Sequence, residues 1–185
     1  MPSKLVETYG ERIPLEARKS ELACQVGVTM RNGAACVQGD VIGEVSASGM
    51  FRRRTRALAT GGGFGVGAAT GTVDDASVFV AGDILKNAAG AVIGTIAVGG
   101  VNTATNTITL TANAAVAVAA GAAVLGSDGS QKASAIADEA ADGLAETQIP
   151  VFVCGLLVES RLRGLDDTAK AELGGASVAG GIFKF

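Results

Sequence analysis

Three carboxylates, Asp138, Glu139 and Asp142, lie close together in the stretch SDGSQKASAIADEAADG (127–143). Acidic side chains at this spacing can act as a general acid and a general base. The chain contains no histidine, so the commonest general base and the commonest metal ligand are both missing. We therefore interpret these acids as the end of a strand, which is entered through a turn at Asp128-Gly129.

The glycine-rich stretch TGGGFGVGAATG (60–71) is a candidate for phosphate binding. A P-loop requires a lysine after its last glycine, and this stretch has none. The dinucleotide pattern G-x-G-x-x-G fits only from Gly63 to Ala68, with alanine last and with no buried strand before it or helical pattern after it. The stretch is typical of a flexible or tightly turned surface loop.

The three cysteines, Cys24, Cys36 and Cys154, include no C-x-x-C pair. Their odd number and spacing indicate neither a zinc site nor a disulfide framework, and we expect small buried thiols in a reducing compartment. No nucleophile motif such as G-x-S-x-G occurs either. The sequence predicts a protein that is not an enzyme and that binds no cofactor or metal.

Arg52, Arg53 and Arg54 lie in the basic stretch FRRRTR (51–56). Nucleic-acid binders combine such stretches with interleaved aromatic residues and a basic balance, whereas this chain has a net charge of −3 and 4% aromatic residues. We interpret the stretch as a solvated loop or an ionic contact with an acidic protein surface. No membrane association is expected, because the N-terminus lacks the apolar region of a signal peptide and the longest stretch of low polarity (114–126) is shorter than the ~20 residues that span a bilayer.

The composition favours thin sheets and tight turns, with 27 glycines and only 18% charged residues. The Asn-Gly step at 32–33 predicts a tight hairpin between two strand-like stretches. A frame of an apolar residue, one variable residue, glycine, one variable residue and two apolar residues recurs at 37–43, 80–86 and 119–126, and predicts a turn that leads into a short strand.

The segment from Asn87 to Ser127 contains no charged residue. Such a segment is buried on both faces or packs against another chain, and we interpret 61–123 as a β-rich insertion. Residues 1–22 form an N-terminal arm, either a short helix or an extended segment. The remainder, 23–185, forms one domain that carries the insertion.

The C-terminal third has the most regular pattern, with two predicted strands and then a helix: KASAIADEAADG (132–143), IPVFVCGLLVESRL (149–162) and LDDTAKAELGG (165–175). Asp166 or Asp167 caps the helix, Asp166 and Lys170 form an i,i+4 pair, and Gly174-Gly175 ends it. GGIFKF (180–185) closes the chain as a strand. The sequence therefore predicts a mostly β fold with a short C-terminal helix (α+β), a small β-sandwich or barrel-like domain.

This order of segments resembles the head decoration proteins of tailed bacteriophages, the family of the lambda head decoration protein D. A D-G-S turn precedes a strand of the form x-I-A-x-E/D, a strand of the form V-x-V-x-G-x-x-x-E-S-x-L follows, and a short helix leads to a terminal G-I-F. Residues 124–185 carry this order, and CVQGDVIGEVSASGMF (36–51) is similar to the family's early strand pair. Small members of the family lack a segment like 61–123.

The resemblance implies a structural protein on the outer surface of the virion, made in the host cytoplasm. It implies a homotrimer at three-fold and quasi-three-fold sites that binds the major capsid protein, with an N-terminal arm that adds a strand to capsid elements. The expected capsid contacts are Leu5, Tyr9, Ile13, Leu15, Arg52, Arg53 and Arg54. The expected trimer contacts are Phe152, Leu156, Ile182 and Phe183.

Two alternatives remain open at this point. A head fibre, a tail-associated module or an adhesin would also be β-rich and free of catalytic residues, although a fibre would show longer repeats than the three unequal frames of this chain. A nucleotide-binding enzyme would require the glycine-rich loop to bind phosphate.

Overall fold

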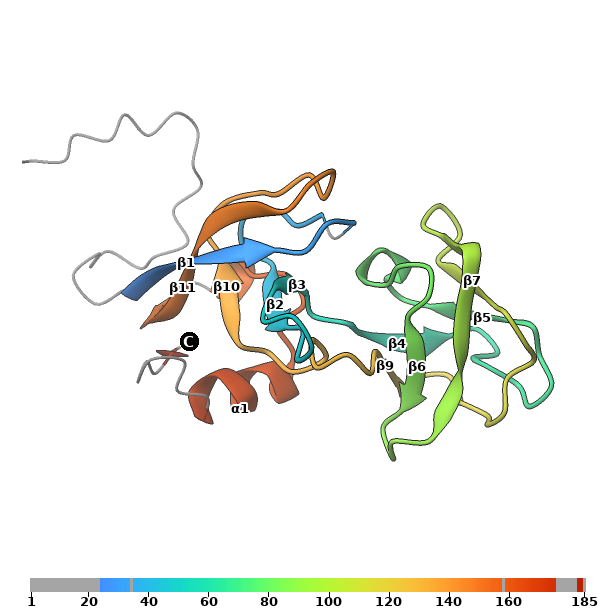
Figure 1. Ribbon diagram of the computed structural model, residues 1–185. Helices are drawn as coiled ribbons and strands as arrows, with labels where there is room; N and C mark the ends of the chain where they lie inside the picture. The colour runs from blue at the N-terminus through green and yellow to red at the C-terminus, as the bar shows by residue number, and fades with distance from the viewer. Residues whose placement is uncertain (1–23, 34, 158, 176–182, 185) are drawn as a thin grey trace, which may run out of the picture.

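The computed structural model describes residues 24–33, 35–157, 159–175 and 183–184. They form two β-rich bodies that lie side by side, and one short helix that packs against the first body (Figure 1). The prediction of a mostly β fold with a short C-terminal helix is confirmed.

The first body, which we call the sheet unit, is built from the two ends of the described chain. Its strands are β1 (Cys24–Met30), β2 (Val41–Glu44), β3 (Phe51–Arg53), β10 (Ala135–Ala137), β11 (Thr147–Leu156) and β12 (Phe183–Lys184). They lie in the order β1-β3-β2-β10-β11-β12, and β11 also pairs with β1. This last pairing returns the sheet to its first strand, so the strands from β1 to β11 close into a ring.

Apolar side chains fill the sheet unit in two places. One cluster includes Met30, Ile42 and Phe51 from the N-terminal strands. In the other cluster, helix α1 (Asp167–Gly175) packs Ala169 and Leu173 against Phe152, Ile136 and Val41. A 3-10 helix, η3 (Glu159–Arg161), connects β11 to α1. The helix therefore completes the core of the sheet unit.

The second body is a closed barrel with the strand order β4-β5-β8-β7-β6-β9. Its strands are β4 (Arg56–Thr60), β5 (Thr70–Val73), β6 (Ile84–Asn87), β7 (Val92–Asn102), β8 (Thr107–Leu110) and β9 (Ala123–Leu125), with the 3-10 helix η2 (Ala76–Val78) after β5. The barrel contains the predicted insertion, 61–123, and extends a few residues beyond it at each end. The reason is that β4 and β9 pair with each other, Arg56 opposite Leu125, and so close the barrel.

The glycine-rich loop encloses one of the largest side chains of the barrel core. Phe64 is 1% exposed and packs among the buried aliphatic residues of the barrel. A Cβ atom on Gly71 would overlap the Phe64 ring, so only glycine allows β5 to pass beside it. The prediction of a tightly turned loop agrees with this geometry, but the burial of Phe64 was not anticipated.

The recurring frame forms the same turn in all three places. In each, the backbone N–H of the fourth residue donates to the carbonyl oxygen of the first: Asp40 to Val37, Asp83 to Val80 and Ala122 to Ala119. The glycines at the third position, Gly39, Gly82 and Gly121, have φ of +88°, +88° and +82°. A short strand, β2, β6 or β9, follows each turn, as the frame predicts.

The hairpin predicted around Asn32-Gly33 does not form. A turn is present, with Gly33 at φ +83°, but β1 pairs antiparallel with β11 along its whole length, from Cys24 opposite Cys154 to Met30 opposite Thr147. The residues after the turn pair instead with the loop beyond β10, where Cys36 and Ala141 form a β-bridge. A long ladder to a distant strand has displaced the local pairing that the turn alone would favour.

The C-terminal helix begins as predicted. The side chain of Asp166 accepts the Ala169 N–H at 2.6 Å, so Asp166 is the cap. The predicted Asp166–Lys170 pair is absent from the described contacts, because Lys170 binds Glu159 at 2.9 Å and Asp166 faces two arginines. The last described strand, β12, runs parallel to β11.

The cysteines differ from expectation. Cys36 is a free, buried thiol, as predicted. The prediction of a reduced thiol is wrong for Cys154, which is disulfide-bonded. The β1–β11 ladder places Cys24 opposite Cys154, and directly opposed residues in an antiparallel pair lie within the Cα separation that a disulfide requires. This register depends on a pairing that the spacing of the cysteines does not reveal.

Candidate functional site

The basic stretch after β3 crosses from the sheet unit into the barrel. β3 ends at Arg53 and β4 begins at Arg56, so Arg52, Arg53 and Arg54, which we call the arginine triplet, lie at the junction of the two bodies. Because neighbouring side chains in an extended backbone point in opposite directions, the three guanidinium groups reach different partners.

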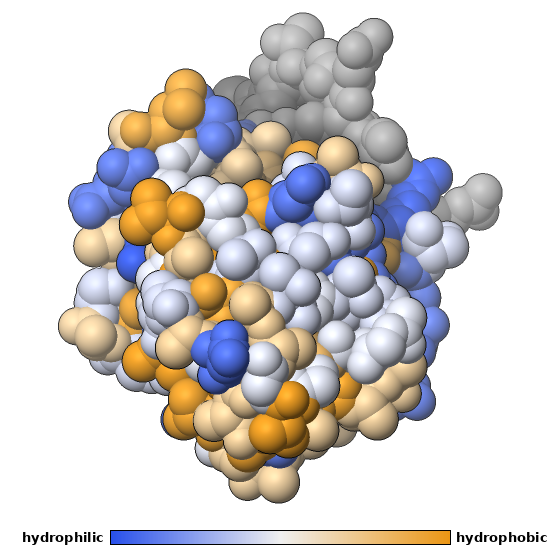
Figure 2. All heavy atoms as spheres, turned by 90° about the vertical axis from the view of Figure 1, so that its right-hand side faces the viewer, coloured by the Kyte–Doolittle hydropathy of each residue, from blue (hydrophilic) through white to orange (hydrophobic). Residues whose placement is uncertain are grey.

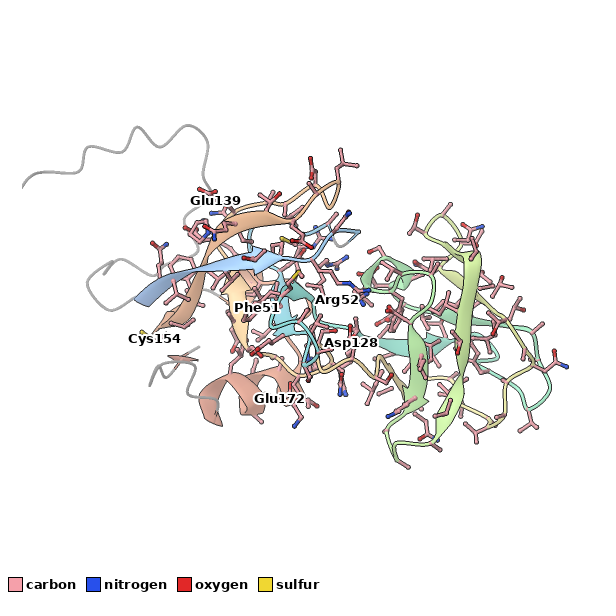
Figure 3. All side chains as sticks on the ribbon, viewed as in Figure 1. Phe51, Arg52, Asp128, Glu139, Cys154 and Glu172 are labelled. Carbon is pink, nitrogen blue, oxygen red and sulfur yellow. The ribbon has the colours of Figure 1, made fainter. Side chains whose placement is uncertain are left out.

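Arg52 extends from β3 toward the barrel and is 1% exposed (Figure 3). Its two terminal nitrogens bind both carboxylate oxygens of Asp83, at 2.8 and 2.9 Å, and one of them donates to the carbonyl oxygen of Val78 at 3.0 Å. The other lies 3.2 Å from Asp128, in the segment that leaves the barrel. Arg52 therefore joins β3 to both the entrance of β6 and the exit from β9.

Arg53 joins a turn of the sheet unit to helix η2 of the barrel. Its Nε lies 3.1 Å from Asp40, and its terminal nitrogens lie 2.8 Å from Asp75 and 2.7 Å from the Ser77 hydroxyl. Asp75 caps η2 by accepting the Ser77 N–H at 2.9 Å. The same carboxylate therefore holds the barrel helix and the arginine.

Arg54 joins the junction to helix α1 and is 4% exposed. It binds Asp166 at 2.8 Å and Glu172 at 2.9 Å, and it donates to the carbonyl oxygen of Gln131 at 3.1 Å. Arg56 binds the second oxygen of Asp166 at 2.6 Å. One carboxylate at the start of α1 thus holds the helix cap and two arginines.

The charges at the junction shift the pKa values of the carboxylates in opposite directions. Burial acts to raise the pKa of Asp128, but hydrogen bonds from Ser130 and the charge of Arg52 outweigh it and lower the pKa. The pKa of Asp75 is lowered in the same way, by Ser77 and Arg53 against burial. For Asp40 burial prevails and raises the pKa, in spite of the Val37 N–H and Arg53.

The expected role of Arg52 and Arg54 in contacting an acidic capsid surface does not fit this geometry. Both are buried, and the carboxylates that bind them belong to the same chain. The third member, Arg53, also binds only partners of the same chain among the described residues. Through these ion pairs the triplet links the sheet unit to the barrel and to α1. The recurring frame carried a signal for this arrangement that the sequence analysis did not use: the aspartates at the fourth position of its first two copies, Asp40 and Asp83, both bind arginines of the triplet.

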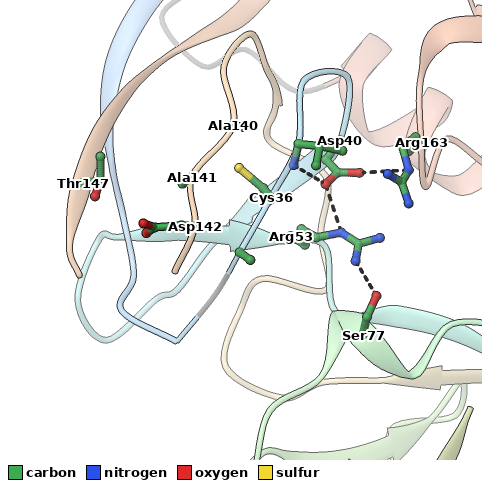
Figure 4. A pocket seen from close by; sticks show the side chains of 11 residues that line it. Cys36, Asp40, Arg53, Ser77, Ala140, Ala141, Asp142, Thr147 and Arg163 are labelled. Atoms are coloured by element: carbon green, nitrogen blue, oxygen red, sulfur yellow. Dashed lines mark hydrogen bonds and ion pairs between the residues drawn. The ribbon is translucent and has the colours of Figure 1, made fainter. Parts of the chain in front are cut away.

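A pocket of about 680 Å³ opens at the junction, beside the arginine triplet (Figure 4). Its apolar lining consists of small side chains from the loops before β2 and between β10 and β11: Ala35, Cys36, Val37, Ala140 and Ala141. Its polar lining consists of Asp40, Arg53, Ser77, Asp142, Thr147 and Arg163. We call it the junction pocket.

In the junction pocket Asp40 pairs with Arg53 and Arg163, and its buried Oδ1 accepts no hydrogen bond from the described residues. Asp40 is 2% exposed; it accepts the Val37 N–H at 2.9 Å and pairs with Arg53, and Arg163 lies 3.6 Å from its other oxygen. Burial raises the pKa of the Cys36 thiol, and this disfavours the reactive thiolate. Small apolar side chains therefore form one part of the pocket lining, and ion-paired side chains form another. The Cys36 thiol is not activated as a nucleophile.

Asp138 and Asp142, at the end of the predicted strand, both accept hydrogen bonds within the chain. Asp138 is buried and accepts hydrogen bonds from Gln25 at 2.8 Å and Gln38 at 3.2 Å. Asp142 accepts the Leu144 N–H at 2.9 Å. Their interpretation as the end of a strand agrees with these contacts. Asp128, in the turn before it, accepts the Ser130 N–H as turn chemistry predicts, and also binds Arg52.

The residues predicted for interfaces fall into three groups. Phe152 is 2% exposed and packs in the core beneath α1, which does not fit the expected trimer contact. Leu156 and Phe183 lie in β11 and β12, at the parallel pairing of these strands. The others lie outside the described residues: Leu5, Tyr9, Ile13, Leu15 and Ile182.

In the described part of the chain, no group of three or more histidine, cysteine, aspartate or glutamate residues is placed to hold a metal ion. None of the described helices is long and apolar enough to cross a bilayer. Comparisons with protein-family models, with curated proteins and with solved structures give no match.

Proposed function

We propose that this protein is a structural component of a phage virion. In this proposal it binds the outside of an icosahedral head as a homotrimer and contacts the major capsid protein at three-fold and quasi-three-fold sites. The similarity of residues 124–185 to head decoration proteins supports it. The order turn, β10, β11, α1 and β12 follows the order of segments on which that similarity rests.

The observation that carries the proposal is the surface of the barrel. The segment from Asn87 to Ser127 has no charge, yet much of it lies on the outside of the barrel, where Val92 is 47% and Val98 is 98% exposed. Figure 2 shows the barrel end of the molecule largely in white and orange, with only isolated hydrophilic residues. Soluble surfaces normally mix charges of both signs, and contiguous apolar patches on a surface mark contacts with other proteins.

The burial of Phe152, Arg52 and Arg54 changes where these contacts are sought. We propose the barrel surface as the main protein contact. The N-terminal arm, with Leu5, Tyr9, Ile13 and Leu15, remains the proposed strand-adding contact with the capsid.

The first test is size-exclusion chromatography with multi-angle light scattering at micromolar concentration. We expect a mass three times that of the single chain. The trimer is then mixed with expanded, undecorated heads and imaged by electron cryomicroscopy, where we expect density at the three-fold and quasi-three-fold positions. A monomer that leaves these positions empty would contradict the proposal. Density only at the tail or at the vertices would favour a tail-associated module or a head fibre.

A further inference from the structure

The barrel carries one apolar side chain that is almost fully exposed. Val98 lies in an irregular part of β7, because the pairing of β7 with β8 skips from Ile96 to Val101. Its exposure of 98% is the highest among the exposed large hydrophobic residues. Nothing in the core of the described chain accounts for a valine at this position.

The backbone around Val98 gives it the form of a narrow projection. Its neighbours are Ala97, Gly99 and Gly100, so no larger side chain surrounds it. Gly99 has φ +68°, and a Cβ atom on Gly100 would lie 2.5 Å from the carbonyl oxygen of Thr109. The backbone of the segment 97–100, which we call the knob, therefore requires glycine at these two positions, and Val98 is its one large side chain.

A trimer requires a different surface to receive the knob. Subunits related by a three-fold axis contact each other head to tail, so a patch on one copy meets a different patch on the next. Two pockets bear on this choice. The smaller, about 260 Å³, is lined by four charged side chains and by small or apolar residues that include Leu58, Leu162 and Leu165. It has less than half the volume of the junction pocket, so it offers less room for the four residues of the knob.

The junction pocket suits the knob better. Its walls are small apolar side chains, including Val37, which is 41% exposed, and Ala140. Charged side chains line it too, Asp40, Arg53, Asp142 and Arg163. Asp40 already pairs with Arg53 at 3.1 Å and with Arg163 at 3.6 Å, so an uncharged insert leaves these pairs in place.

We propose that the knob of one copy inserts into the junction pocket of the next, and that three such contacts close the trimer. This inference rests on the proposed trimer and names the surfaces that form it. The occupant is a second copy of this chain. Burial of Val98 and Val37 against each other removes the two exposed valines from water.

Disulfide trapping tests the contact. In a Cys36→Ala background, which removes the pocket thiol, the pair Val98→Cys and Ala140→Cys is oxidised and run on a non-reducing gel. We expect covalent dimers and trimers, with the ladder ending at three chains. Mixing the two single cysteine variants must give only dimers. The matched control pairs Ala140→Cys with Val66→Cys, a valine 71% exposed in the glycine-rich loop, and we expect it to remain monomeric on the gel.

A second variant measures the same contact without cross-linking. Val98→Asp should weaken trimer association by about tenfold or more, because a charge would be buried in an apolar contact. The melting temperature of the monomer should not change, since the side chain is exposed there. Val66→Asp should leave association unchanged.

The outcomes separate this inference from the proposed function. A trimer by light scattering that gives no Val98–Ala140 cross-link and tolerates Val98→Asp overturns the knob contact and leaves the decoration trimer standing. A monomer in solution that trimerises on heads without the cross-link also overturns it. A protein that neither trimerises nor binds heads overturns both.

Discussion

Arg52 shows what a buried charge requires of its surroundings. Its guanidinium is 1% exposed and Asp83 binds it with both oxygens. Removing one partner of such a pair leaves the other charge buried and unpaired, which is more unfavourable than the pair itself is favourable. The pair therefore matters for the stability of the fold mainly because its loss would leave a buried charge without a partner.

We expect Arg52→Met to lower the free energy of unfolding by about 3–5 kcal/mol, measured by urea titration followed by circular dichroism. The double variant Arg52→Met, Asp83→Leu should recover much of this loss, because no charge then remains unpaired. Lys132→Met, at an exposed position, is the control and should change little. Equal effects of the single variant and the control would show that Arg52 is not buried in solution.

Asp166 gives the stability of the protein a defined dependence on pH. Burial acts to raise its pKa, but the Ala169 N–H and Arg54 outweigh burial and hold the pKa below its ordinary value. A carboxyl group with a lowered pKa in the folded state stabilises the protein above the unfolded pKa of about 3.9. This contribution is lost as the pH falls through the lower, folded-state value.

Asp166→Asn should therefore reduce stability at pH 7 by about 1 kcal/mol, a figure reduced for the partial exposure of the carboxylate. The difference from the unmodified protein should disappear as the pH falls below about 3.9 toward the folded-state pKa. Urea unfolding across this range measures it, with Glu146→Gln at an exposed position as control. A difference that stays constant with pH would show that the charge of Asp166 is not involved.

At the scale of elements, the recurring turn is the feature that the sequence indicates most directly. It depends on a glycine with positive φ in the third position, and its first two copies add an aspartate that the arginine triplet uses. The third copy has Ala122 at the position of these aspartates, and it forms the same turn without an arginine. The turn therefore forms from the residues within it, and it does not depend on the ion pair that the aspartates of the first two copies make.

Gly82→Ala should lower the free energy of unfolding by about 1–2 kcal/mol, because a side chain is strained at φ +88°. Gly62→Ala is a close control: neither glycine has an atom within 4 Å of an added Cβ, and only Gly82 has a positive φ. Thermal unfolding of the two variants isolates the backbone effect. If both variants melt alike, the turn is not held at this φ.

The elements also show where prediction from sequence ends. The cap at Asp166 and the three turns are determined within a few residues, and both were predicted. The pairing of β1 with β11 joins residues more than a hundred positions apart, and it overrides the hairpin that Asn32-Gly33 favours locally. The burial of Arg52 has the same origin, because its partners Asp83 and Asp128 come from distant loops that meet only in the folded chain.

At the scale of the whole molecule, the barrel is connected to the sheet unit by two neighbouring segments. One runs from β3 to β4, the other from β9 toward β10, and the hydroxyls of Thr55 and Ser130 lie 2.8 Å apart, buried between them. The arginine triplet adds ionic contacts on the same side. We expect the two bodies to unfold as one cooperative unit, and Thr55→Val should weaken that coupling. Two separate transitions in the calorimetry of the unmodified protein would contradict this expectation.

The adjacency of the barrel's two ends has a consequence for engineering. Arg56 lies opposite Leu125, so a foreign domain whose own termini are close together could replace the barrel without stretching the sheet unit. Such a graft would remove Asp75 and Asp83, and Arg52 and Arg53 would then face the graft without these carboxylates. A successful chimera would therefore either supply acidic residues at those two places or carry uncharged residues at 52 and 53.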